Sequence, residues 1–77
     1  MSETEKAANA EMIEGFRDGY DLTAPEPSGN RSHSYRHGFM AGRNDKMPYG
    51  EGPFHGLSFA EVTRMADEAM AKDEEAS

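Results

Sequence analysis

The sequence contains no cysteine and no tryptophan, and it is poor in large aliphatic side chains. The absence of cysteine excludes a disulfide framework, a thiol nucleophile and a cysteine-based zinc site. Leu, Ile, Val and Phe together make up only eight of the 77 residues, which excludes a large hydrophobic core. No apolar run approaches the roughly 18 residues that a membrane span requires, so we expect no contact with a membrane.

The beginning of the chain also lacks the features of a secretory signal peptide. Its first 14 residues carry four glutamates against one lysine. A signal peptide instead begins with a basic region that an apolar stretch follows. The simplest expectation is therefore a cytoplasmic protein that forms one small domain, residues 1–77.

The formal net charge of −7 is concentrated at the two ends of the chain. Residues 58–77 carry six acidic side chains against two basic ones, and residues 1–14 are acidic too. The window 31–46 is basic, because a single aspartate stands there against four cations: Arg31, Arg36, Arg43 and Lys46. The overall acidity argues against tight non-specific binding of nucleic acid. Two interpretations of the basic window stay open, a local phosphate-facing patch and simple neutralisation of charge within the fold.

Periodic apolar residues and capping signals predict an all-α fold. A first helix is expected over about residues 4–20, where Ser2 and Glu5 have the spacing of a capping box. A second helix is expected over about residues 33–43. The N-cap of this second helix should be one of two serines, Ser32 or Ser34. Between the two helices, Pro25 and Pro27 favour an extended connector.

The last third of the chain predicts an irregular loop and a third helix. Residues 44–57 contain three glycines and two prolines, so this segment should be irregular. A helix is expected over about residues 59–72, because Ser58 and Glu61 form a second capping box before an apolar stripe. Both ends of the chain are expected to fray.

An internal repeat is the most informative feature of the sequence. Residues 15–19 and 38–42 both read G-F-x-x-G. Glycine costs about 1 kcal/mol inside a helix relative to alanine, so four such glycines indicate a packing role. Small residues spaced by four allow two helix backbones to approach closely. We therefore predict an antiparallel helical hairpin packed through the paired G-F-x-x-G faces, whose packing residues are Gly15, Phe16, Gly19, Tyr35, Gly38, Phe39 and Gly42. The alternative is that Gly19 and Gly42 only end their helices as C-caps.

This repeat and its surroundings carry a resemblance that covers about residues 10–45. Gly15-Phe16-x-x-Gly19, the proline connector, and Ser34-Tyr35-x-x-Gly38-Phe39-x-x-Gly42-Arg43 follow one another. In this order they resemble the ribosome modulation factor family, small bacterial proteins of two helices whose second helix has the pattern S-x-W-x-x-G-W-x-x-A. The resemblance implies binding to the small ribosomal subunit through its RNA, slower translation, and inactive ribosome dimers. The chain differs from the member that gives the family its name in being acidic and in having residues 47–77 in addition.

No arrangement of residues indicates catalysis, and we expect neither an enzyme nor a bound cofactor. The chain has no nucleophile elbow, and Gly50-Glu51-Gly52 is too short for a phosphate-binding loop. His33 and His37 lie four residues apart, and His55 would be a third metal ligand. A solvated or phosphate-facing histidine pair is the favoured interpretation, so we predict no metal site.

Two binding functions remain. In the first, the ribosome or another RNA is bound by residues of the basic segment, namely Arg31, Arg36, His37, Arg43, Lys46 and Tyr49. In the second, the acidic chain is an inhibitor, for example one encoded by a phage, that binds a basic protein and blocks a nucleic-acid-binding machine. Met65 and Met70 in the third helix would then either contact that partner or fill the core. The oligomeric state is left open.

Overall fold

The computed structural model describes residues 3–48 and 50–76, and within them it contains helices and no strands. This confirms the all-α class. The helices are α1 (Glu3–Gly19), α2 (His33–Lys46) and α3 (Phe59–Ala76). The predicted capping role of Ser2 and the predicted RNA contact of Tyr49 lie outside the described residues.

Serine side chains cap two of the helices. At the start of α2, Ser32 has an extended backbone and its Oγ accepts a hydrogen bond of 3.0 Å from the Tyr35 nitrogen. Ser58 does the same for α3, because its Oγ accepts from the Glu61 nitrogen at 3.1 Å. Each bond satisfies one amide that the helix itself leaves without a partner. Of the two N-cap serines that the sequence allowed for α2, the first is the one used.

Two helices are longer than their patterns predicted. The second helix continues to Lys46, and Met47 then closes it with a hydrogen bond of 3.0 Å from its nitrogen to the Arg43 oxygen. Nothing before Pro48 breaks the helix, so the extra turn forms at no cost in backbone hydrogen bonds. The third helix continues through the acidic tail to Ala76 instead of ending near residue 72.

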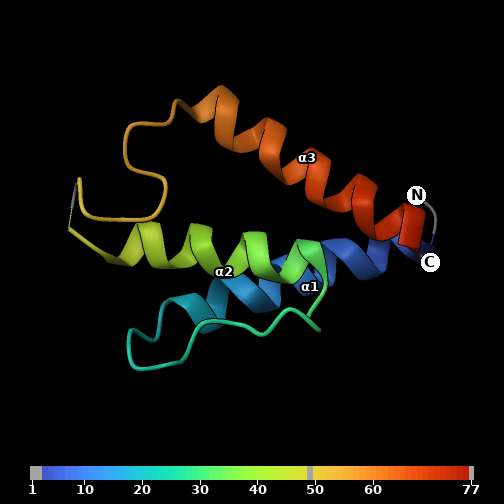
Figure 1. Ribbon diagram of the computed structural model, residues 1–77, viewed down its shortest axis with the longest axis horizontal. Coiled ribbons are helices and arrows are strands. Elements are labelled where there is room, and N and C mark those ends of the chain that lie inside the picture. Colours follow the sequence, from blue (N-terminus) through green and yellow to red (C-terminus); the bar gives the residue numbers. More distant parts are fainter. Residues whose placement is uncertain (1–2, 49, 77) are drawn as a thin grey trace.

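The first two helices run parallel to each other, so the prediction of an antiparallel hairpin is wrong. In Figure 1, α1 runs from right to left, the connector returns along the pair, and α2 again runs from right to left. The contacts agree, because Gly38 faces Met12 and Gly42 faces Phe16. Residue numbers thus rise in the same direction along both helices.

The connector between the helices explains this direction. It covers residues 20–32, and thirteen extended residues reach about 40 Å, well beyond the roughly 21 Å of a 14-residue helix. It therefore has the length to return along the whole of α2. Its prolines keep it extended. A short turn would have forced antiparallel packing, whereas this segment permits the parallel one.

The glycines of the repeat lie at the contact between α1 and α2. A Cβ atom on Gly15 would overlap the Tyr35 carbonyl oxygen and lie 2.9 Å from the Phe39 nitrogen. A Cβ atom on Gly19 would overlap the Phe39 carbonyl oxygen and lie 2.9 Å from the Arg43 nitrogen. The two backbones are therefore in direct contact at these positions, which only glycine allows.

The opposite side of the contact repeats this arrangement. A Cβ atom on Gly38 would overlap the Met12 carbonyl oxygen, and one on Gly42 would overlap the Phe16 carbonyl oxygen. Gly15 meets the Tyr35 oxygen, and Gly38 meets the Met12 oxygen. Gly38 follows Gly15 by 23 residues, and Tyr35 follows Met12 by the same number. The two helices thus pack through equivalent positions, as in a pair related by twofold pseudosymmetry.

The two phenylalanines of the repeat differ in their environment. Phe39 is only 3% exposed, whereas Phe16 is 38% exposed and contacts the Tyr20 ring with centroids 5.3 Å apart. The Tyr35 side chain is buried, and its hydroxyl donates a hydrogen bond of 2.5 Å to Asp18 Oδ2. This hydrogen bond, together with burial, raises the pKa of Tyr35.

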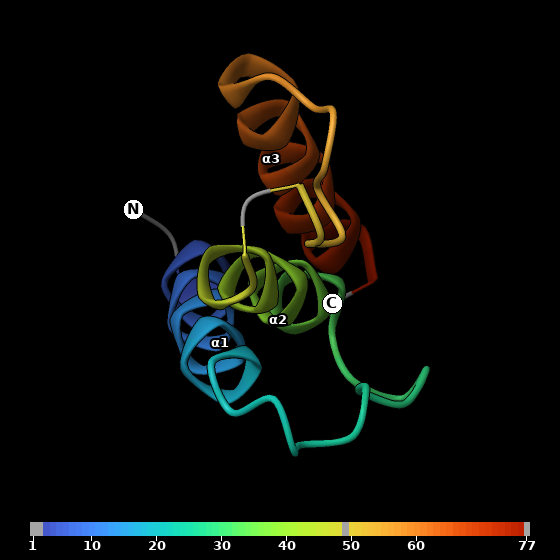
Figure 2. The ribbon, with the colours of Figure 1, turned by 90° about the vertical axis from the view of Figure 1, so that its left-hand side faces the viewer.

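The third helix lies over α2 and runs in the opposite direction. Figure 2 shows α2 between α1 and α3 when the molecule is viewed from one end. Ala69 is the buried residue of α3, and Phe54 of the preceding loop is buried against the His37 ring with centroids 5.3 Å apart. The start of α3 is open to solvent, because Phe59 is 87% exposed.

In the described part of the chain, no helix is long and apolar enough to cross a membrane.

Candidate functional site

Two arginines of the predicted basic segment lie on one side of α2. Arg36, Met40 and Arg43 are spaced by four and three residues, so they form a ridge along the helix. They line a cavity of about 120 Å³ between the connector and the loop that precedes α3. We call this cavity the notch, and its lining residues are Glu26, Pro27, Arg36, Phe39, Met40, Arg43 and Pro53.

Arg43 is held in place by the connector and by the end of α1. Its Nη2 donates hydrogen bonds to the carbonyl oxygens of Asp21 at 3.1 Å and Ala24 at 2.9 Å, and its Nε donates to Gly19 O at 3.5 Å. Its guanidinium carbon lies 4.6 Å from the centroid of the Phe39 ring. The side chain thus ties the connector to α2, and the guanidinium is fixed in one position.

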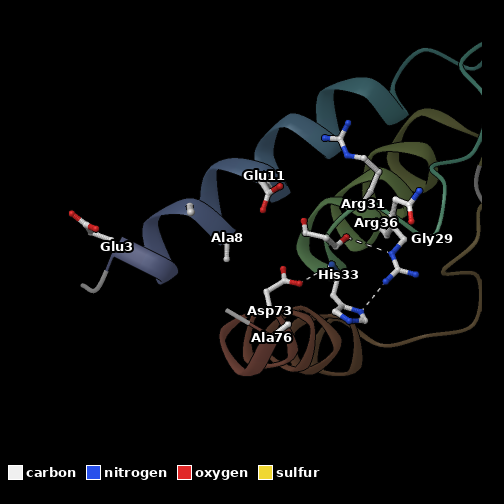
Figure 3. Close-up of a pocket in the computed structure, with 12 residues that line it drawn as sticks. Glu3, Ala8, Glu11, Gly29, Arg31, His33, Arg36, Asp73 and Ala76 are labelled. Carbon is white, nitrogen blue, oxygen red and sulfur yellow. Dashed lines mark hydrogen bonds between the residues drawn. The ribbon is translucent and has the colours of Figure 1, made fainter.

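Arg36 is held at the other end of the notch by the first turn of α2. Its Nε donates to the Ser32 carbonyl oxygen at 3.4 Å, and its Nη2 lies 3.0 Å from His33 Nδ1. Figure 3 shows both interactions beside the N-terminus of α2. Arg36 therefore borders two hollows, the notch and the open depression that the same figure shows.

Carbonyl oxygens and an imidazole hold these two arginines without neutralising their charge. No carboxylate of the described residues lies within ion-pair distance of Arg36 or Arg43. Two acidic side chains lie nearby, Glu26 in the lining of the notch and Asp21 in the connector. Hydrogen bonds from Thr23 lower the pKa of Asp21, and the Arg43 charge adds a smaller effect in the same direction. The notch is accordingly an apolar hollow with a positive charge at each end and Glu26 at its rim.

The other predicted contact residues lie elsewhere. Arg31 stacks on the Tyr35 ring, with 3.5 Å from its guanidinium carbon to the centroid, and pairs with Glu14 at 3.7 Å. Lys46 lies 5.9 Å from the Tyr20 ring centroid. Tyr20 itself donates a hydrogen bond to Asp45. The basic segment is thus divided between the connector and more than one side of α2 instead of forming one continuous patch.

His37 faces the loop that precedes α3. Its ring packs on Phe54, and burial lowers the pKa of His37. A neutral imidazole against an aromatic ring contributes packing and no charge. His33 lies beside Arg36, whereas His55 lies in the loop near Gly50. Among residues 3–48 and 50–76, no group of three or more His, Asp or Glu side chains could hold a metal ion.

The depression in Figure 3 is where three helix ends meet. Asp73 of α3 accepts hydrogen bonds of 2.8 Å from the backbone nitrogens of His33 and Ser34, one on each carboxylate oxygen. Burial acts to raise the pKa of Asp73, but the hydrogen bonds from Ser34 and His33 outweigh it, so the pKa lies below its ordinary value. Asp73 therefore already fills the anion position at the N-terminus of α2.

From the sequence, Met40 was expected to offer adaptable apolar contact, but its placement between the arginines and the contact of Asp73 were not predicted. Met40 is 46% exposed between the two arginines, and its helical spacing from them was the available signal. Asp73 lies about 40 residues from its partners, in a tail that was expected to fray, and the sequence carries no signal for that contact.

No protein-family model, no curated protein and no solved structure matches this chain.

Proposed function

We propose that this chain is a non-catalytic regulatory protein that binds RNA through the notch on α2, with ribosomal RNA as the first candidate partner. One observation carries the proposal, namely that Arg36 and Arg43 flank one hollow and neither is paired with a carboxylate of the described residues. RNA offers phosphates for the two guanidinium groups and bases for the apolar surface between them. The resemblance to the ribosome modulation factor family points to the same partner.

The whole-chain charge sets the expected strength of this binding. A net charge of −7 repels a polyanion, so attraction must come from the two arginines at short range. We therefore expect modest affinity that falls steeply with salt concentration. Arg31 and Lys46 should contribute little, because Arg31 is paired with Glu14 and Lys46 lies outside the notch.

The test compares charge reversals at two exposed or half-exposed arginines. Binding of the full chain to purified small ribosomal subunits and to a single-stranded RNA is measured at several salt concentrations. Arg36→Glu should weaken binding at least tenfold and reduce the salt dependence, whereas Arg64→Glu on α3 should change it little. Equal loss in both variants, or no RNA binding by the unmodified chain, would contradict the proposal.

A specific observation favours a second candidate, the acidic protein-binding regulator. Ile13 and Phe16 on α1 and Tyr20 directly after it are 60%, 38% and 39% exposed. Exposed apolar side chains in a row are common at protein interfaces. If the chain binds a basic protein after nuclease treatment, and Ile13→Ser abolishes this binding while Arg36→Glu does not, the second candidate replaces the first.

A further inference from the structure

We infer that the notch receives one unpaired base of single-stranded RNA while Arg36 and Arg43 bind the phosphates on either side of it. This inference rests on the proposed RNA binding and adds the class of RNA that is bound. It follows from the size of the notch, from the placement of its charges and from the character of its walls.

The notch has the size of a single small group. Its volume of about 120 Å³ and its open mouth admit one protruding group of a partner, and not a whole helix or folded loop. A planar ring inserted edge first is an occupant of suitable size. A base within a duplex is stacked on both faces, so only an unpaired base is able to enter.

The walls of the notch suit a flat ring. Pro27 of the connector, Pro53 of the loop and the half-exposed Met40 of α2 line the notch, whereas the buried Phe39 ring lies beneath the Arg43 guanidinium. These side chains offer apolar contact without a hydrogen-bond pattern of their own, which favours stacking over readout of a sequence. Glu26 at the rim supplies an acceptor for an exocyclic amino group, as adenine carries.

The two arginines are arranged for phosphates rather than for the base. They lie seven positions apart on α2, which corresponds to about 10 Å along the helix axis, with the notch between them. Consecutive phosphates of an extended strand are separated by several ångströms, so two phosphates that flank one inserted base fall within reach of both side chains. Since carbonyl oxygens hold Arg43 in place, less side-chain entropy is lost when it binds.

The experiment uses three probes of comparable charge with the full chain. The probes are single-stranded oligoadenylate, the adenine–uracil duplex of half that length, which carries about the same number of phosphates, and inorganic polyphosphate. We expect oligoadenylate to bind at least fivefold more tightly than either of the others. Met40→Ala should weaken oligoadenylate binding about fivefold and leave polyphosphate binding unchanged. Leu22→Ala is the matched control, because Leu22 is 49% exposed and lies outside the notch.

The outcomes separate this inference from the proposed function. Equal binding of the single strand, the duplex and polyphosphate, all sensitive to Arg36→Glu, would overturn the base-binding notch and leave RNA binding in place. Binding of oligoadenylate that Met40→Ala and Leu22→Ala reduce equally would also overturn it. Failure of every probe to bind would overturn the proposed function itself.

Discussion

The carbonyl oxygen of Met12 in α1 occupies the place where a Cβ atom on Gly38 of α2 would have to lie. The same relationship recurs between Phe16 and Gly42, one helical turn further along both helices. Direct backbone contact over two turns lets dispersion forces act between main chains, and this partly replaces the large side chains that the sequence lacks. The parallel direction of the pair also brings the connector back beside α2, where it forms one wall of the notch.

The first prediction concerns this contact. Gly38→Ala should lower the free energy of unfolding by about 2 kcal/mol, because the added methyl group must push two backbones apart. The gain in helix propensity of about 1 kcal/mol does not offset this. Gly29→Ala is the control, since nothing lies within 4 Å of a Cβ atom there. Urea denaturation measures both variants, and equal stability of the two would contradict the close contact.

The second prediction concerns Asp73, whose carboxylate joins α3 to the N-terminus of α2. Asp73→Ala should lower the free energy of unfolding at neutral pH by about 1 kcal/mol, the usual value of a lost N-terminal cap. Asp67→Ala, also on α3 and exposed, should have little effect. Thermal unfolding of the two variants at the same pH tests the difference.

The contribution of Asp73 should also depend on pH. Its pKa in the folded chain lies below the ordinary value of 3.8, so folding favours the ionised form. The stabilisation is therefore fully present above pH 3.8 and is lost as the pH falls through the lower, folded-state pKa. The stability difference between the unmodified chain and Asp73→Ala should shrink over that acidic range. A difference that stays constant there would mean that the carboxylate charge has no part in the contact.

The third prediction concerns Arg43 as a tether of the connector. Arg43→Met keeps the stem of the side chain but removes the hydrogen bonds to Gly19, Asp21 and Ala24, each worth about 1 kcal/mol or less at a partly exposed site. We expect faster amide hydrogen exchange at Ala24, whose nitrogen donates to Asp21 O at 3.0 Å. Arg64→Met should leave that exchange rate unchanged. Unchanged exchange at Ala24 in Arg43→Met would show that the connector is held by other contacts.

The local parts of the fold could be predicted from the sequence because they depend on neighbouring residues. Ser32 and Ser58 cap the helices that follow them, and both capping bonds join residues three positions apart. The repeated glycines also identified the surface between α1 and α2. Each of these features has its physical cause within about one turn of chain, where spacing alone carries the information.

The direction of α2 and the placement of its charges could not be predicted in the same way. Two G-F-x-x-G faces fit together in either direction, so Gly15 and Gly38 do not distinguish parallel from antiparallel packing. The choice depends on the course of the connector. Arg43 fixes this course through hydrogen bonds to three carbonyl oxygens that lie 19 to 24 positions earlier in the chain. Contacts between distant residues also distinguish the cations. From the sequence, Arg31 and Arg43 are equivalent, but in the structure Arg31 pairs with Glu14 and Arg43 donates to carbonyl oxygens.

The central claim, parallel packing of α1 and α2 that builds the notch, is tested most directly by one distance. Nitroxide labels on cysteines placed at Lys6 and Lys46, in a chain without native cysteine, report the separation of the start of α1 from the end of α2. Gly15 is level with Gly38 in the parallel pair, so Lys46 lies 17 positions beyond the level of the other label, and the labelled positions should lie about 26 Å apart along the axis. An antiparallel pair with the same glycines in contact would bring them within about 8 Å along the axis, and that shorter separation would contradict the account.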